Sequence, residues 1–186
     1  KQFAMFEIHG GLIFKNEVSG ACGGIGANSS TYLNMTGGII SKNTSNSIGG
    51  IGFVSDGTGF FNLYGGNIEY NVVYTNGGGG VFVNNANFNM YNGVIRKNKA
   101  RKSHGGGCYF SDSNIKIYGG EISENEAGYY NTNGLVFEGG GIFNNVNVNF
   151  EMYDGKITKN VSGDLGGGIA FYNKTCTGTI YGGKIT

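Results

Sequence analysis

The chain has 186 residues, which suits a single domain, 1–186. Its 38 glycines come without any proline, which excludes a collagen triple helix. The formal net charge of +1 excludes a strongly charged surface for nucleic acid or acidic membranes, and no apolar run approaches the ~18 residues of a membrane helix.

A short phrase recurs along the chain, in which an isoleucine stands three places before an asparagine. Successive asparagines of this phrase are 27, 28, 27, 27 and 35 residues apart. A repeat of this length without a helical pattern is typical of a solenoid, in which each turn of the chain repeats the last. The asparagines are Asn16, Asn43, Asn71, Asn98, Asn125 and Asn160.

Each repeat predicts three strands in chain order. The first strand, as at 61–64, alternates buried and exposed positions and ends in tyrosine. A glycine-rich corner follows, as at 65–66, because glycine tolerates the positive φ of a sharp turn. The second strand carries the isoleucine–asparagine phrase. The third opens after glycines with an aliphatic residue, which Cys108 replaces, so we expect Cys108 to be a small buried hydrophobe.

Three strands per turn of about 27 residues predict an all-β, right-handed, single-stranded parallel β-helix of about seven coils. Equivalent residues then lie above one another at the ~4.8 Å spacing of paired strands. The six asparagines form an interior ladder whose amides bond from coil to coil. A β-sandwich of hairpins is the alternative, but it predicts less regular spacing. The predicted interior files are Leu33, Phe61, Phe88, Ile115 and Phe150, and Met35, Leu63, Met90, Ile117, Met152 and Ile180.

The Gly-Gly-Ile segments, paired with aliphatic-x-x-Asn segments, resemble the repeats of chlamydial polymorphic outer-membrane proteins and of related adhesin-like β-helix proteins of bacteria and archaea. The resemblance extends from about Ile8 to Thr186, although phenylalanine commonly stands in the chlamydial pattern where this chain has isoleucine. It implies a pectin-lyase-like fold, an extracellular or cell-surface location and an adhesive role. It also implies a glycan or a host or cell-surface protein as the partner.

The acidic residues offer one candidate for catalysis. Asp56 and Asp112 take similar places two coils apart, so stacking predicts about 10 Å between them. That separation is near the range of inverting glycosidases. Both follow a serine at a corner, however, which favours turn residues that bond their own backbone. We therefore expect no catalytic residue, and a polysaccharide-cleaving enzyme or a phage-type glycan-binding fibre is the alternative.

Other chemistry-bearing residues fit no known motif. His9 and His104 are expected at the surface. The glycine runs lack the lysine of a phosphate loop and the aspartate of a calcium repeat. Cys22, Cys108 and Cys176 are too far apart for a zinc motif, and their redox state stays open. We expect neither a metal nor a cofactor.

Two features are candidates for binding. The tyrosine that ends the first strand recurs on five coils and faces outward, so it predicts an aromatic strip for sugars or proteins. A self-stacked ladder that only stabilises the strands is the alternative. The lengthened coil contributes a loop excursion, 128–139, in which 135–137 alternatively form an extra strand. The candidate binding residues are Tyr64, Tyr91, Tyr118, Tyr153, Tyr181, Tyr129, Tyr130 and Phe137.

The only dense charge runs from Arg96 to His104, and a solvated corner is its expected role. Contact with an anionic glycan is the alternative, while the lack of interleaved aromatic residues disfavours single-stranded nucleic acid. Together these observations predict a non-enzymatic extracellular segment of a longer protein, acting as stalk and contact surface. Both ends stop within a coil, so end-to-end self-association, or a structural filament subunit, is a further alternative.

Overall fold

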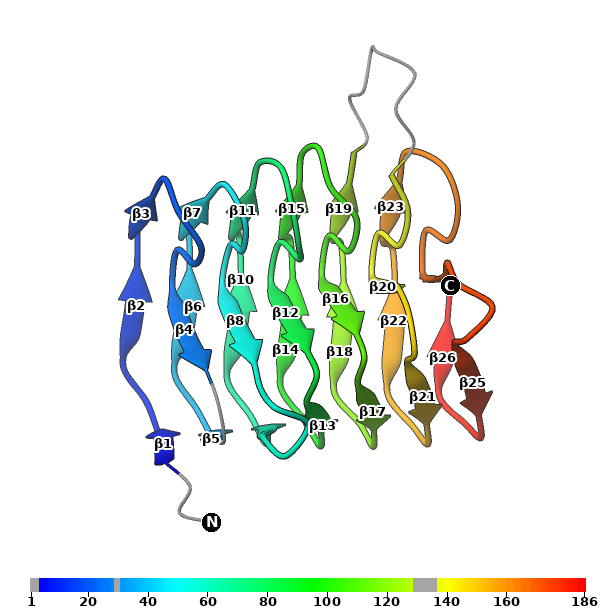
Figure 1. Cartoon of the computed structure of the whole chain (residues 1–186), viewed down its shortest axis with the longest axis horizontal. Coiled ribbons are helices and arrows are strands. Elements are labelled where there is room, and N and C mark those ends of the chain that lie inside the picture. Colours follow the sequence, from blue (N-terminus) through cyan, green and yellow to red (C-terminus); the bar gives the residue numbers. More distant parts are fainter. Residues whose placement is uncertain (1–3, 29–30, 129–136) are drawn as a thin grey trace.

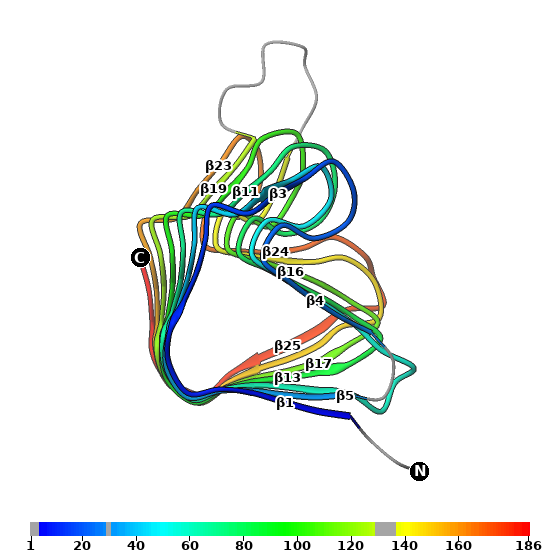
Figure 2. The ribbon, with the colours of Figure 1, turned by 90° about the vertical axis from the view of Figure 1, so that its left-hand side faces the viewer.

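The computed structural model describes residues 4–28, 31–128 and 137–186, which form strands and turns but no helix. The chain coils about one long axis, and equivalent strands of successive coils lie side by side (Figures 1 and 2). Every strand pairing is parallel and joins one coil to the next, in four sheets that run the length of the molecule. The protein is therefore a parallel β-solenoid, as predicted.

The first two sheets have seven strands each. The first sheet contains β1 (Ala4–Ile8), β5 (Thr31–Met35), β9 (Phe60–Leu63), β13 (Asn87–Met90), β17 (Asn114–Ile117), β21 (Asn149–Met152) and β25 (Thr177–Ile180). The second sheet contains β2 (Leu12–Phe14), β6 (Ile39–Ser41), β10 (Asn67–Glu69), β14 (Val94–Arg96), β18 (Glu121–Ser123), β22 (Lys156–Thr158) and β26 (Lys184–Ile185).

The other two sheets have six strands each. The third sheet contains β3 (Glu17–Val18), β7 (Thr44–Ser45), β11 (Val72–Val73), β15 (Lys99–Ala100), β19 (Glu126–Ala127) and β23 (Val161–Ser162). The fourth sheet contains β4 (Ile25–Asn28), β8 (Ile51–Val54), β12 (Val81–Asn84), β16 (Cys108–Ser111), β20 (Ile142–Asn144) and β24 (Ile169–Phe171).

These sheets correct the prediction in one respect. Each coil has four strands instead of three, because a two-residue strand follows each ladder asparagine and is too short to show an alternating pattern. The first two sheets have seven strands each, so the chain enters the seven coils expected and completes about six turns. The right-handed sense of the winding and the likeness to pectin lyases stay predictions.

Aliphatic and aromatic side chains fill the interior as predicted. Leu33, Phe61 and Phe88 of the first sheet are fully buried, and the isoleucines of the second sheet face them across the core. Ile180 is the exception, with 53% of its surface exposed, because no described coil follows to cover it. The alternating pattern therefore placed the core correctly wherever a coil has neighbours on both sides.

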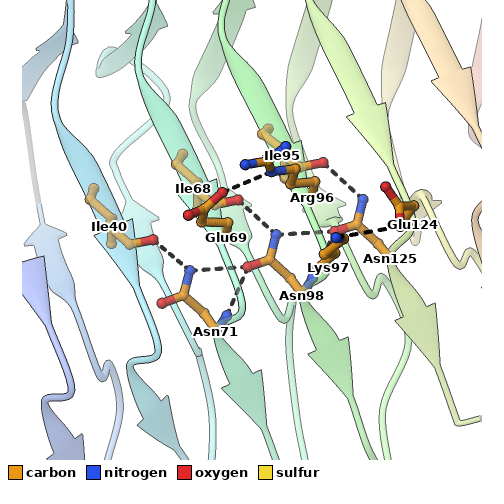
Figure 3. Close-up of polar contacts among 10 residues, drawn as sticks. All are labelled: Ile40, Ile68, Glu69, Asn71, Ile95, Arg96, Lys97, Asn98, Glu124 and Asn125. Atoms are coloured by element: carbon orange, nitrogen blue, oxygen red, sulfur yellow. Dashed lines mark hydrogen bonds and ion pairs between the residues drawn. The ribbon is translucent and has the colours of Figure 1, made fainter.

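The asparagine ladder is present inside the turn between the second and third sheets (Figure 3). The Oδ1 of Asn98 accepts the backbone N–H and the Nδ2–H of Asn71, both at 3.0 Å. The Nδ2 of Asn98 donates to the carbonyl of Ile68 at 2.9 Å, and the pattern repeats at Asn125. Asn43, Asn71, Asn98 and Asn125 are fully buried, while Asn16 is exposed and Asn160 half-buried in the end coils. The predicted interior ladder is confirmed.

The three cysteines are free thiols. Cys108 is fully buried, as predicted, and burial raises its pKa. Burial also raises the pKa of Cys22 to about 11, and its thiol donates to the carbonyl of Ile25. Because the thiolate is the reactive form, we expect Cys108 to resist alkylation at pH 8 in the native protein and to react once the protein is unfolded. Peptide mass spectrometry after timed iodoacetamide exposure measures this, and rapid native labelling of Cys108 would contradict the buried placement.

Candidate functional site

Five tyrosines, each immediately after a strand of the first sheet, form a column of side chains that point outward. Their exposed fractions run from 38% to 65%, so the predicted outward orientation is confirmed. Neighbouring ring centroids are 4.7 to 5.0 Å apart, with interplanar angles of 5° to 16°. We call this column, comprising Tyr64, Tyr91, Tyr118, Tyr153 and Tyr181, the tyrosine row.

The stacking decides which part of each ring meets solvent. Nearly parallel rings about 5 Å apart cover one another's faces, so the ring edges and hydroxyl groups of the inner tyrosines face outward. The tyrosines therefore form the self-stacked ladder that was the alternative reading of their recurrence, and such stacking stabilises parallel strands. The predicted binding role of the row stays a prediction, with the hydroxyls and edges as its contact groups.

One member of the row belongs to a charged cluster. The hydroxyl of Tyr153 donates to Glu151 at 2.6 Å, and Glu151 also pairs with Lys116 at 3.4 Å. The hydrogen bond to Glu151 raises the pKa of Tyr153 to about 12, and the same bond lowers the pKa of Glu151. The phenol therefore stays protonated and can accept a further hydrogen bond at neutral pH.

A second outward file lies on the same sheet. The Nδ2 of Asn62 donates to Asn34 at 2.9 Å, and the Nδ2 of Asn89 donates to Asn62 at 2.9 Å. These asparagines alternate in sequence with buried core residues, so they face outward beside the tyrosine row. The outer face of the first sheet is thus polar, with amide and phenol groups repeating from coil to coil.

A groove follows the tyrosine row along the corner between the first and second sheets. It has a volume of about 590 Å³ and crosses four successive coils. In each of these coils the row tyrosine stands immediately before the corner. The groove is lined by Asn92, Gly93, Val94, Gly119, Gly120, Glu121, Asp154, Gly155, Lys156, Gly183 and Lys184. The glycine-rich sequence predicted turns at these corners but did not indicate a groove.

The two candidate aspartates do not occupy equivalent places. Strand register aligns Val54 with Asn84 and Ser111, so Asp112 is level with Asn85 and Asp56 lies one residue further along. Asp56 accepts the backbone N–H of Thr58 at 3.1 Å, as expected of a turn residue. Asp112 instead accepts the side chains of Ser111 at 2.9 Å and Asn147 at 2.8 Å. Neither arrangement resembles an acid–base pair facing a common substrate.

Three of the five Lys and Arg side chains of the basic segment pair with glutamates on neighbouring coils. Arg96 pairs with Glu69 at 2.8 Å and Lys97 with Glu124 at 3.7 Å (Figure 3). Lys99 pairs with Glu126 at 2.9 Å. The corner that the sequence predicted to be solvated therefore carries ion pairs between neighbouring coils. These pairs leave less unpaired positive charge for an anionic glycan.

His104 differs from the surface histidine expected. Its ring stacks on Phe143 with centroids 4.3 Å apart, and its Nδ1 accepts the backbone N–H of Glu138 at 3.1 Å. Burial lowers the pKa of His104, so the ring is neutral at pH 7. Phe82, His104, Tyr109 and Phe137 contribute to a pocket of about 470 Å³ on this side of the solenoid.

The loop excursion is described only at its two ends. Phe137 is 8% exposed and packs edge-on against His104, so it is not the surface residue that the binding hypothesis required. Tyr129, Tyr130 and the alternative strand at 135–136 lie outside the described residues.

No three His, Cys, Asp or Glu side chains of the described residues gather as they would around a metal ion. None of the described residues belongs to a helix able to cross a membrane.

The fold and its recurring side chains define a parallel β-solenoid repeat protein with a buried asparagine ladder. No protein-family model matches the chain, and no curated protein or solved structure matches it either.

Proposed function

We propose that this solenoid is an extracellular or cell-surface segment of an adhesin-like protein, serving both as a stalk and as a surface that contacts glycans or proteins. The observation that carries the proposal is the tyrosine row, which presents phenol edges and hydroxyls at a regular interval on a rigid scaffold. Tyrosine is enriched at recognition surfaces because it combines a large apolar body with a polar tip. The resemblance of the repeats to adhesin-like β-helix proteins supports the location.

The stalk role follows from the continuous packing of the coils. Each coil bonds to the next through four sheets and through the asparagine ladder, so the rod has few places at which to bend. Among the residues that the structure describes, no specific contact favours the alternatives of a polysaccharide-cleaving enzyme or a filament subunit.

The double substitution Tyr91→Ser and Tyr118→Ser tests the contact surface. We expect at least about tenfold weaker binding to glycan arrays or cell surfaces, since two of the three inner phenols of the row are lost. Tyr74→Ser is the matched control, because Tyr74 has a similar exposed fraction but follows the third sheet. Circular dichroism melting establishes that all variants are folded at the assay temperature. Unchanged binding by the double variant would remove the row from the proposed function.

A further inference from the structure

The floor of the groove is made of glycine backbone. Gly93, Gly120, Gly155 and Gly183 occupy one file on four successive coils, with left-handed φ values between 87° and 108°. A Cβ on Gly120 would lie 2.6 Å from the Met90 side chain and 2.8 Å from the carbonyl of Gly93. Glycine is therefore required here, and no side chain of these residues shields the corner backbone from the groove.

Most backbone N–H groups of these four glycines have no partner within the described residues, although the glycines differ in exposure, from the buried Gly93 to the exposed Gly183. The N–H of Gly155 donates to the exposed carboxylate of Asp154 at 2.7 Å, which shows that an oxygen acceptor can reach this backbone position from solvent. No described residue accepts a hydrogen bond from the N–H of Gly93, Gly120 or Gly183, which share its backbone conformation. The glycines that line the groove therefore leave backbone donors without an internal partner, except at Gly155, where a carboxylate occupies the N–H.

The charges around the groove are mixed and balanced. Glu121, Lys156 and Lys184 stand in register on three successive strands of the second sheet, and none forms an ion pair with a described residue. With Asp154, they give two carboxylates and two ammonium groups. This set offers hydrogen-bond donors and acceptors without a net charge, which suits a neutral polyhydroxylated ligand better than a polyanion.

The spacing along the axis indicates how such a ligand would lie. Tyrosine centroids beside the groove recur every 4.7 to 5.0 Å. An extended β-1,4-linked glycan advances by nearly the same distance per sugar ring, so each ring can face one coil.

We propose that the groove binds a neutral, extended β-1,4-linked glycan parallel to the solenoid axis. Sugar oxygens accept from the N–H groups of Gly93, Gly120 and Gly183, while the charged side chains of the second sheet and the tyrosine hydroxyls bond the remaining hydroxyls. This inference rests on the proposed contact function and names its ligand class and its site.

Amide NMR titration with cellohexaose, chitohexaose and mannohexaose tests the proposal. On adding at least one of these neutral β-1,4-linked probes, we expect the amide resonances of Gly93, Gly120 and Gly183 to shift most. Maltohexaose, whose α-1,4 linkage curls the chain, and hexagalacturonate, which is acidic, should shift them less. Absence of shifts at these glycines with every neutral probe would overturn the proposal, as would tighter binding of hexagalacturonate or equal binding of maltohexaose.

Two reciprocal substitutions sharpen the test. Asn92→Asp places a carboxylate beside Gly93 as Asp154 stands beside Gly155, so it should occupy that donor and weaken binding about three- to tenfold. Asp154→Ala frees the N–H of Gly155 and should strengthen binding by a similar factor. If both variants bind like the parent protein, the site is wrong. The contact function survives that result if the Tyr91→Ser and Tyr118→Ser variant loses binding, and it fails too if no glycan or cell surface binds.

Discussion

Replacing Asn98 with leucine is expected to lower the free energy of unfolding by about 4 kcal/mol, because several buried polar groups lose their partners at once. The backbone N–H and the Nδ2 of Asn71 lose the acceptor that they share. The carbonyl of Ile68 and the Oδ1 of Asn125 lose a donor. Asn71, Asn98 and Asn125 are fully buried, so water does not replace these bonds.

Asn89→Leu is the matched control for this experiment. Asn89 lies in the same turn of the chain and donates to Asn62 in its own ladder, but on the outer face, where water can take over the bond. We expect its effect to stay within about 0.5 kcal/mol. Asn98→Asp preserves the shape and the acceptor but removes the donor, so at pH 7 it should remain strongly destabilising. Urea unfolding followed by circular dichroism measures all three, and equal costs for Asn98→Leu and Asn89→Leu would show that the interior amides do not stabilise the coil.

Replacing Gly106 with alanine should destabilise the protein by at least about 3 kcal/mol, for a steric reason. A Cβ at this position would lie 2.5 to 2.6 Å from the backbone atoms of Glu126 in the next coil. Because those atoms belong to the paired strand β19, they cannot move aside as a flexible side chain would. Gly49, Gly79 and Gly140 meet the backbone of the next coil in the same way, which explains the first glycine of each pair.

Gly26→Ala provides the comparison for Gly106→Ala. Gly26 is in strand β4, and a Cβ there would meet only the Cβ of Cys22, at 3.6 Å. We expect a change within about 0.5 kcal/mol in urea unfolding. If Gly106→Ala were as well tolerated as Gly26→Ala, the close approach of coils at the glycine pairs would be relaxed in solution.

The recurring asparagines were the most informative signal in the sequence. A polar residue that returns at a fixed interval within an otherwise aliphatic strand must satisfy its amide inside, and stacked coils provide the partner. The same recurrence predicted the buried files at Phe61 and Phe88, since a residue that keeps its place in each repeat keeps its place in each coil. The outward tyrosine row followed from the same alternation.

Structural features that depend on contacts between neighbouring coils could not be predicted from the repeat pattern of the sequence. The residue before each ladder asparagine adopts a left-handed φ of 54° to 57°, yet its identity varies among lysine, tyrosine and glutamate. That conformation is uncommon in non-glycine residues, and composition alone did not indicate it. The burial of His104 was missed for a related reason, because its partner Phe143 lies 39 residues away in sequence.

The sequence by itself determined the parallel winding, the interior ladder and the outward tyrosines, because each depends only on which residue recurs at which place in the repeat. The tertiary structure alone decided which ring surfaces of the tyrosines remain exposed, which lysines are neutralised and which glycines line the groove. Those properties depend on distances between neighbouring coils, and a one-dimensional repeat does not encode them.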